Sequence, residues 1–291
     1  MAERRPFCAD LSRANGESLA ATASRIDRWF LVEYRGLWTS DALAGSGLSD
    51  QVKSHLREQA RAAGRARVLF VRRPDRRRER GVVAYAADSR EGREQLRRFE
   101  LENHDDLREL DLVASSGGAP VEHPLFVVCT HGKHDPCCAR YGRPLYEALR
   151  DEVEPDWVWQ VTHVGGDRFA GNLVCLPEGV YYGRADRAEA VAILDEHLAG
   201  RIWLDGYRGR SCYPFAVQAA ELEVRRGTGL TGISDLALAA VRRDGDTWQV
   251  TFRAGGEEYE VEVEPELGDF TYLTCNSPAV QRPRHFVATR R

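Results

Sequence analysis

The sequence predicts an α/β protein, in which a mixed sheet with flanking helices is preceded by a smaller α/β unit and followed by helices and a β-hairpin. Two observations predict this class. Short segments rich in branched and aromatic residues, such as 29–34 and 125–130, alternate with longer helix-like segments such as 185–200. A Ser-, Gly- and Pro-rich segment, 115–124, separates two such alternations. We therefore expect two consecutive α/β units with a further region after them.

The first unit begins with a strand over 29–34 (WFLVEY), because aromatic and branched residues favour extended chain. A helix is expected over 48–63, ending near a glycine. Strands follow at 67–73 and 81–87, joined by the arginine-rich turn PDRRRER, which we interpret as a solvated loop or a docking patch for an acidic redox partner. The segment 91–101 has helical spacing, and so the predicted order is β-α-β-β-α.

The second unit begins with the strand 125–130. Pro136 stands where a first helical turn should start, because its fixed φ suits that position. The preceding Asp135 is interpreted as the helix N-cap. The helix should run to about residue 150. The remaining elements are a strand at 157–164, two strands within 172–184 and an amphipathic helix at 185–200. The order β-α-β-β-β-α is that of a thioredoxin-like layer.

The region after the second unit departs from this pattern. Segments 213–226 and 234–243 have helical character, and 247–266 alternates apolar and polar residues as a hairpin does. A basic tail follows. The expected division of the chain is 1–120 (N-terminal α/β unit), 121–205 (thioredoxin-like core) and 206–291 (C-terminal helical segment with a β-hairpin).

Composition narrows the range of functions. The 291 residues are 43% hydrophobic and 30% charged, with a formal net charge of -4, which gives no reason to expect nucleic-acid or membrane binding. Arginine carries nearly all the positive charge, which is typical of a GC-rich bacterial gene. The start lacks the apolar core of a signal peptide, so we expect a cytoplasmic protein. In that reducing compartment, seven cysteines indicate one local site and several buried thiols rather than a disulfide framework.

The densest group of ligand-type side chains is 129–138, CTHGKHDPCC. Cys129 falls at the end of a predicted strand, and Cys137 and Cys138 fall in the first turn of the following helix. Unpaired backbone N–H groups and the positive end of the helix dipole favour a thiolate there. The segment therefore predicts a metal site or a redox site.

A second group occupies 163–172, HVGGDRFAGN. His163 ends a predicted strand, and Asp167 follows four residues later across two glycines that allow a tight turn. An imidazole and a carboxylate at this spacing can bend around one iron or zinc ion. Since both groups lie at equivalent strand ends of one layer, we expect them to form one site.

These two segments, with CLPEGVYYGR after them, are very similar to the sucrase/ferredoxin-like family, whose core resembles thioredoxin-like [2Fe–2S] ferredoxins. The match is specific over about 125–200, and the stretch around Cys8 and 29–43 and the segment GYRGRSCYPFAVQAAE also resemble it. The resemblance implies a [2Fe–2S] cluster bound by Cys129, Cys138 and His163. In some eukaryotic relatives the second pair is His-x-x-x-His, and here Asp167 stands where its second histidine would be.

The fourth ligand therefore stays open. Asp167 ranks first, Cys137 is a rival because it adjoins Cys138, and Cys175 is a more distant candidate. His131 and His134 are interpreted as loop residues or as neighbours of the ligands. The remaining cysteines, Cys8, Cys212 and Cys275, are interpreted as structural, with approach to the site as the alternative for Cys212. The three arginines Arg168, Arg208 and Arg210 are interpreted as surface ion pairs, or as residues that neutralise the cluster or a partner's carboxylate.

The predicted function is a one-electron carrier, an electron-transfer protein rather than a catalyst, which works with a reductase or acceptor protein that the sequence does not identify. One alternative is a thioredoxin-type dithiol oxidoreductase in which Cys129 attacks and Cys138 resolves, although the Cys-x-x-Cys pattern is absent. Another is a zinc protein that uses Cys129, Cys138, His163 and one of Asp167, His131 or His134. No carboxylate pair stands out that would support glycoside hydrolysis.

Overall fold

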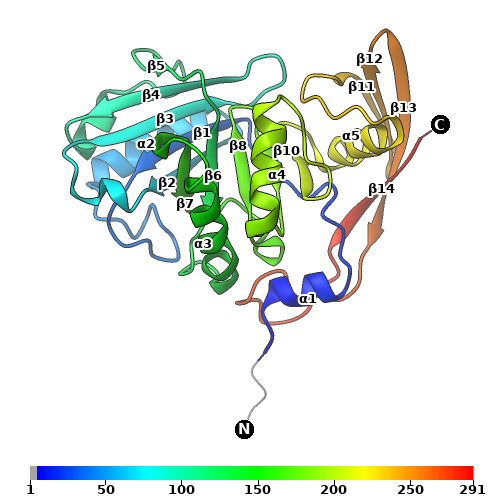
Figure 1. Cartoon of the computed structure of the whole chain (residues 1–291), viewed down its shortest axis with the longest axis horizontal. Coiled ribbons are helices and arrows are strands. Elements are labelled where there is room, and N and C mark those ends of the chain that lie inside the picture. The colour runs from blue at the N-terminus through cyan, green and yellow to red at the C-terminus, as the bar shows by residue number, and fades with distance from the viewer. Residues whose placement is uncertain (1–4, 291) are drawn as a thin grey trace.

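A ten-stranded mixed sheet forms the body of the molecule (Figure 1), and the computed structural model describes residues 5–290. The strand order is β10-β9-β8-β6-β7-β2-β1-β3-β4-β5. The elements of its first half are α1 (Cys8–Ala14), β1 (Arg28–Glu33), α2 (Asp50–Ala62), β2 (Ala66–Arg72), β3 (Val82–Asp88), β4 (Gln95–Leu101) and β5 (Ala119–Pro120), with short 3₁₀ helices at Asp75–Arg78 and His104–Glu109. The second half comprises β6 (Leu125–Cys129), α3 (Pro136–Arg150), β7 (Val158–Val161), β8 (Leu173–Leu176), β9 (Val180–Tyr182), α4 (Arg187–Leu198) and β10 (Tyr207–Arg210), with 3₁₀ turns at Pro155–Trp157 and Asp167–Phe169.

The two halves have the same topology. In each, two parallel strands are joined by a helix (β1-α2-β2 and β6-α3-β7), and two antiparallel strands follow on the other side of the first strand. The second half has the strand order β9-β8-β6-β7 and ends with α4, and this confirms the predicted thioredoxin-like layer. The halves join edge to edge where β2 pairs antiparallel with β7. The N-terminal unit is thus a topological copy of the layer that carries the ligand-type residues.

The sheet curls so that the faces without helices meet in one shared core. Trp29 on β1 contacts Tyr181 on β9, with ring centroids 5.9 Å apart, although four strands lie between β1 and β9 in the sheet. Tyr85 on β3 contacts Trp159 on β7 in the same way, at 5.8 Å. Because these large rings come from both halves and are buried, neither half has a complete core without the other.

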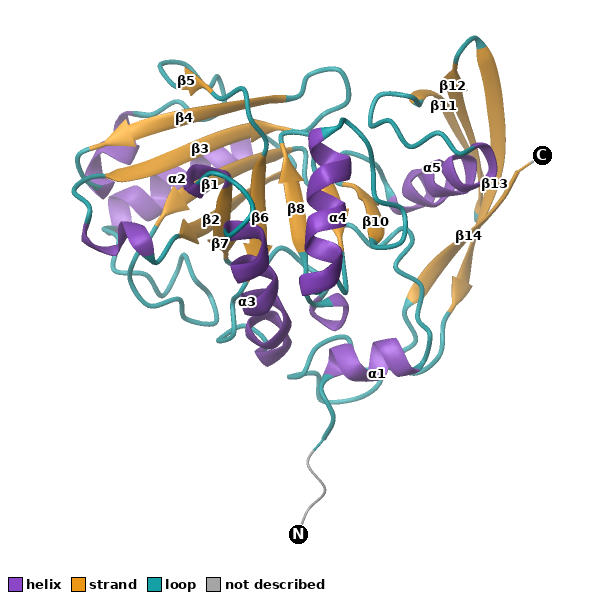
Figure 2. Ribbon diagram, in the orientation of Figure 1, coloured by secondary structure: helices purple, strands orange, loops and turns teal. Residues whose placement is uncertain are grey.

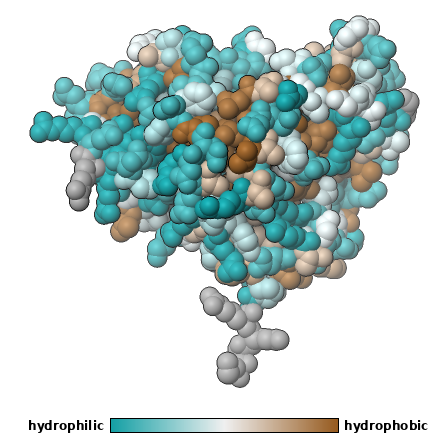
Figure 3. Space-filling view, viewed as in Figure 1, coloured by the Kyte–Doolittle hydropathy of each residue, from teal (hydrophilic) through white to brown (hydrophobic). Residues whose placement is uncertain are grey.

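The helices cover the outer faces of the two layers (Figure 2). Leu56 of α2 belongs to a cluster with Phe30 and Phe70, while Leu145 of α3 belongs to one with Phe126 and α4. The side chain of Asp135 caps α3 by accepting from the backbone N–H of Cys137 at 2.8 Å, as predicted. The face with α3 and α4 presents mainly hydrophilic residues, with a smaller apolar group near its middle (Figure 3).

The C-terminal region holds one long helix and a second sheet. Helix α5 (Phe215–Thr228) packs against an antiparallel sheet in the order β11-β12-β13-β14, formed by β11 (Ala237–Asp244), β12 (Thr247–Ala254), β13 (Glu257–Leu267) and β14 (Arg284–Arg290). The predicted hairpin over 247–266 is confirmed as β12 and β13. Strand β10 belongs to the large sheet although it lies beyond residue 205, and the division at 120 and 205 stays a prediction.

Two predicted helices are wrong. Segment 91–101 contains β4, in which Leu96 and Phe99 are three residues apart as on a helix but pack into clusters on opposite faces of the sheet. Segment 234–243 overlaps β11, whose alanines suggested a helix but which pairs along β12. Pairing with a neighbouring strand overrode local propensity in both cases. Among residues 5–290, none of the helices combines the length and the apolar character that a membrane crossing requires.

Candidate metal centre

The sheet brings the two predicted ligand segments together at one edge. Cys129 is the last residue of β6, and His163 lies two residues beyond the end of β7. Because β6 and β7 are parallel, their carboxyl ends meet, and α3 starts beside them with Cys138 in its first turn. The sulfurs of Cys129 and Cys138 and a ring nitrogen of His163 lie within 4.8 Å of one another.

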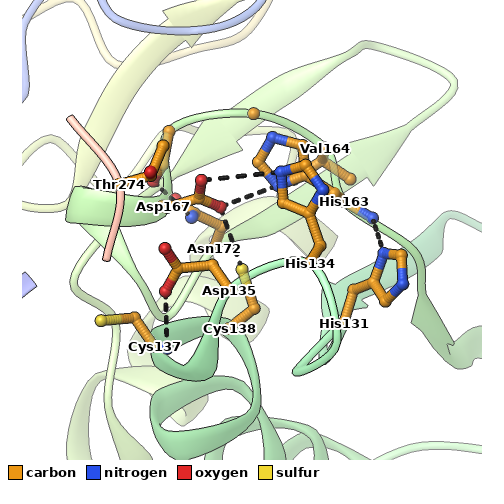
Figure 4. A network of polar contacts seen from close by, with 12 residues as sticks. His131, His134, Asp135, Cys137, Cys138, His163, Val164, Asp167, Asn172 and Thr274 are labelled. Carbon is orange, nitrogen blue, oxygen red and sulfur yellow. Dashed lines mark hydrogen bonds and ion pairs between the residues drawn. The ribbon is translucent and has the colours of Figure 1, made fainter. Parts of the chain in front are cut away.

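Asp167 joins this group from the turn after His163 (Figure 4). Its Oδ1 accepts a hydrogen bond from Sγ of Cys138 at 3.2 Å and lies 2.9 Å from Nδ1 of His163. Nδ1 of His163 is buried, and its contact with the Asp167 carboxylate turns it toward the cluster of ligand-type side chains. The side chain of Asp167 is 3% exposed, and that of His163 is 23% exposed. The site is thus enclosed on the Asp167 side and open to solvent at His163.

His134 and His131 lie beside the same group in different roles. Nε2 of His134 is 3.7 Å from Oδ2 of Asp167, and its ring stacks on that of His163 with centroids 3.9 Å apart. His131 has both ring nitrogens engaged, since Nδ1 accepts from the His163 backbone N–H at 3.3 Å and Nε2 meets the Thr39 carbonyl at 2.7 Å. His134 is therefore an additional donor for a metal, whereas His131 positions the loop.

The N-terminal half contributes residues that the sequence reasoning missed. Besides Thr39, the carbonyl of Ser40 meets Nδ1 of His134 at 3.4 Å, and Trp38 packs edge-on to the ring of His131. These residues follow β1 as the ligand loop follows β6. The signal that could have found them is the repeated β-α-β-β-β order, because it places the loop after β1 across the junction of the two halves.

A buried arginine braces the loop between His163 and Asp167. Arg208 donates from Nη1 to the Gly165 carbonyl at 3.2 Å and to Oδ1 of Asn172 at 2.7 Å. Asn172 in turn donates to the carbonyl of Gly166 at 2.9 Å. The interpretation of Arg208 as a surface residue is wrong, since it is 1% exposed. Arg210 is buried as well, and Arg168 pairs with the nearly buried Glu17 at 2.8 Å.

The rival fourth ligands lie elsewhere. Cys175 on β8 packs in the cluster under α3 and α4, on the opposite face of the sheet from the cluster that contains Cys129. Sγ of Cys137 lies 3.3 Å from Sγ of Cys275 and 3.6 Å from Sγ of Cys8. Of the three candidates for the fourth position, Asp167 is the one whose side chain lies against Cys138 and His163.

The electrostatics favour a thiolate at Cys129 and a carboxylate at Asp167. The Cys138 side chain beside Cys129 holds the pKa of Cys129 well below its usual value against the effect of burial. The same contact, with burial, raises the pKa of Cys138. Burial lowers the pKa of His163, but the Asp167 carboxylate and the Cys129 sulfur outweigh it and raise that pKa to about 9. Burial raises the pKa of Asp167, and the neighbouring His163 outweighs this and lowers it.

This donor set fits a metal or a small metal cluster. Thiolate, imidazole and carboxylate are the usual protein ligands of zinc and iron, and a cation would offset the charge that burial makes unfavourable. The residues that would hold it are Cys129, Cys138, His163 and Asp167, with His134 beside them.

Comparison with known proteins places this site within a family. The sucrase/ferredoxin-like family model matches residues 19–209, which include all four of these residues. Two yeast proteins named altered inheritance of mitochondria protein 32 are similar to this chain. The protein of Meyerozyma guilliermondii is 36% identical over 96 residues, which cover 29% of this chain and 34% of that protein. The protein of Debaryomyces hansenii is 30% identical over 95 residues, which cover 29% of this chain and 35% of that protein. The matched part is thus about a third of the length of these relatives.

Among solved structures, a thioredoxin-like [2Fe–2S] ferredoxin from Aquifex aeolicus is 19% identical, with a TM-score of 0.29, and the match covers 32% of this chain and 97% of that one. A cysteine-to-serine variant of that ferredoxin is 18% identical, with a TM-score of 0.28, and the match covers 30% of this chain and 100% of that one. The family model, by contrast, spans well over half of the chain. The chain belongs to the sucrase/ferredoxin-like family.

Proposed function

We propose that this protein is a one-electron carrier that binds a [2Fe–2S] cluster through Cys129, Cys138, His163 and Asp167. The observation that carries the proposal is the meeting of two sulfurs, an imidazole and a carboxylate at one edge of the sheet, from three separate segments. A cluster of this kind, when bound, supplies one-electron transfer. The protein supplies the ligands, a buried setting and a surface for its partner. We expect it to work in the cytoplasm, where thiols stay reduced.

The two ends of the site have different surroundings. Cys129 and Cys138 are each 1% exposed, so their sulfurs would be held away from water. His163 lies at the open end, and its stacked neighbour His134 is about a third exposed. Electrons would therefore enter and leave beside the two histidines. A histidine ligand with a free ring nitrogen can also hold or release a proton, which would couple the reduction potential to pH.

A basic hollow beside the site is suited to an acidic redox partner. One part, of about 470 Å³, is lined by residues of the ligand loop, among them Thr130 and Lys133. It shares Arg72 and Arg143 with a second part of about 590 Å³. The arginines around the second part are Arg35, Arg72, Arg73, Arg77 and Arg143. The shared rim residue Leu37 is 87% exposed, an apolar contact point within a positive surface.

A single zinc ion at the same residues is the second candidate. The geometry allows it, because two ligands on one tetrahedral zinc ion, a sulfur and an oxygen, lie about 3.5 Å apart, and Sγ of Cys138 is 3.2 Å from Oδ1 of Asp167. A dithiol oxidoreductase is less well supported. The lowered pKa of Cys129 would suit an attacking thiolate, but burial of Cys129 and Cys138 keeps a protein disulfide from reaching either sulfur.

The deciding experiment is anaerobic purification followed by assays for iron, acid-labile sulfide and zinc. The proposal expects about two irons and two sulfides per chain, with visible absorption that bleaches on dithionite reduction. Cys129→Ser and Cys138→Ser should lose the colour, while the matched control Cys175→Ser, another buried cysteine, should keep it. If the protein is colourless and its zinc is lost in Cys129→Ser, the site binds zinc and the electron-carrier proposal is wrong. If the protein is colourless and Cys129→Ser changes no metal content, both candidate functions are wrong.

A further inference from the structure

A second group of cysteines lies apart from the site described above. Cys8 begins α1, Cys137 is in the first turn of α3, and Cys275 lies in the loop between β13 and β14. Their sulfurs are mutually close: Cys8 to Cys137 is 3.6 Å, Cys137 to Cys275 is 3.3 Å, and Cys275 to Cys8 is 3.6 Å. Along the sequence, Cys8 and Cys137 are 129 residues apart, Cys137 and Cys275 are 138 apart, and Cys8 and Cys275 are 267 apart. The tertiary structure thus gathers three thiols from the two ends and the middle of the chain.

The shape of this group matches the ligands of one tetrahedral ion. With metal–sulfur bonds of about 2.3 Å, two sulfurs on one zinc ion lie about 3.8 Å apart. The three observed distances are nearly equal and only slightly shorter. A disulfide would draw two sulfurs to about 2.05 Å and leave the third unpaired, and all three are free thiols. An iron–sulfur cluster would spread its cysteines over several irons rather than crowd them into one triangle.

A buried carboxylate completes the group. Asp135 is 0% exposed, and its carboxylate forms no ion pair with an arginine, lysine or histidine among the side chains that the structure describes. Its Oδ1 accepts from the Cys137 backbone N–H at 2.8 Å, and its Oδ2 accepts from the Cys275 backbone N–H at 2.7 Å. Sγ of Cys8 is 3.9 Å from the same Oδ2. These two N–H bonds at the start of α3 offset part of the charge of the buried carboxylate, and a metal ion among the three sulfurs would stabilise it further.

We propose that Cys8, Cys137 and Cys275, with Asp135 as the fourth ligand, bind one structural zinc ion. Three thiolates and one carboxylate oxygen are all zinc ligands and can complete a tetrahedron, and burial of all but the Cys275 side suits a closed structural site. The backbone N–H of Cys8 donates to Sγ of Cys275 at 3.4 Å, and such N–H donors stabilise metal-bound thiolates. Loss of the thiol protons on binding couples the affinity to pH.

The ion would tie two distant parts of the fold to the start of α3. It joins α1, the C-terminal loop and the turn that carries Asp135 and Cys137 next to Cys138 (Figure 4). Figure 1 shows α1 beneath the large sheet, alongside the chain segment that leads into β14. These contacts involve few buried apolar residues, namely Cys8, Ala9, Cys137 and Ala170 with a few partly buried neighbours. A metal crosslink would therefore supply most of the stability there.

The test is the zinc content of the anaerobically purified full chain. We expect about one zinc per chain that survives dialysis against a weak chelator, and its loss in Cys8→Ser, Cys137→Ser and Cys275→Ser. Cys212→Ser is the matched control, because Cys212 is buried among apolar side chains of a different cluster, and it should keep the zinc. Cobalt substituted for zinc should give the visible bands of a tetrahedral thiolate site in wild type and not in the three variants.

Two further measurements keep the test decisive. Cys275 is partly exposed in a loop, so Cys275→Ser is the variant most certain to fold, and its circular dichroism is compared with that of Cys212→Ser. Cys129→Ser and Cys138→Ser should retain this zinc even though they lose whatever the other site binds, which separates the two proposals. Zinc retained in Cys275→Ser, iron in place of zinc, or a disulfide between Cys137 and a partner in the anaerobic protein would each overturn the inference.

Discussion

Sγ of Cys138 lies 3.2 Å from Oδ1 of Asp167, although the two residues are 29 positions apart and belong to different segments. The contact places a carboxylate where the resemblance to relatives would have placed a second histidine. Asp167 also lies 2.9 Å from His163, so one side chain touches both kinds of donor. The first prediction concerns this residue.

Asp167→Ala should make the proposed cluster labile, because a ligand is lost and His163 loses its charged neighbour. We expect the visible absorption to fall to less than half of the wild-type value per chain after gel filtration. Asp167→His should keep the colour, since imidazole is a better iron ligand than methyl. The control is Asp151→Ala, an exposed carboxylate at the end of α3. Unchanged spectra in Asp167→Ala would remove Asp167 from the ligand set.

The reduction potential should fall as pH rises, because a reduced, more negative cluster holds a proton on a ligand imidazole more tightly. Protein-film voltammetry between mildly acidic and alkaline pH measures this slope. His163→Cys should flatten the slope and lower the potential, because a thiolate adds negative charge and has no ring proton to exchange. A potential that stays constant with pH in the wild type contradicts histidine ligation.

Metal-free protein should lose stability between about pH 6.5 and 9. The pKa of His163 is raised to about 9, so its charged form stabilises the folded state fully below the unfolded value of about 6.5, and this contribution is lost as pH rises through 9. The loss should reach at most about 3 kcal/mol. Urea unfolding of chelator-treated protein at several pH values measures it, and His163→Gln should remove most of the dependence. An equal slope in that variant would assign the effect to other groups.

Gly166→Ala should destabilise the site more than Gly64→Ala destabilises its turn. Both glycines have φ of +80°, so both substitutions carry similar backbone strain, about 1–2 kcal/mol. A Cβ at Gly166 would also lie 2.3 Å from a guanidinium nitrogen of Arg208, whereas one at Gly64 meets nothing within 4 Å. The decrease in melting temperature relative to wild type should therefore be larger for Gly166→Ala, and the excess over Gly64→Ala measures the clash with Arg208. Equal decreases in melting temperature would mean that the Arg208 side chain moves aside without destabilising the fold.

Arg143→Glu should slow reduction by an acidic partner at least severalfold at low ionic strength, with the difference shrinking as salt is added. Arg143 is exposed on the shared wall of the basic hollow. Arg57→Glu on α2 makes the same charge change on another exposed surface and serves as the control. Stopped-flow rates with a small acidic electron donor provide the measurement. Equal slowing in both variants would indicate an effect of net charge alone.

The structure brings together the candidate ligands that the sequence singled out, whereas two elements of the surrounding fold differ from the sequence prediction. Cys129, Cys138, His163 and Asp167 stand out in the sequence because ligand-type residues at the ends of two parallel strands must meet at one edge of the sheet. The roles of Arg208 and Thr39 could not be seen, because each reaches the loop from a segment far away in sequence. Strands β4 and β11 were predicted as helices, since local spacing does not report the partner strand that a segment pairs with.

The sequence by itself determined the family resemblance, the thioredoxin-like order of the second half and the residues at its strand ends, because these depend on local periodicity and on motifs within short segments. Only the tertiary structure decided that the N-terminal unit repeats the same topology and closes a shared core, as the contact of Trp29 with Tyr181 shows. It also separated Cys137 from Cys138 by directing Cys137 toward Cys8 and Cys275. Neighbouring residues in a helix turn point about 100° apart, and which cluster each one joins depends on distant segments that pack against that turn.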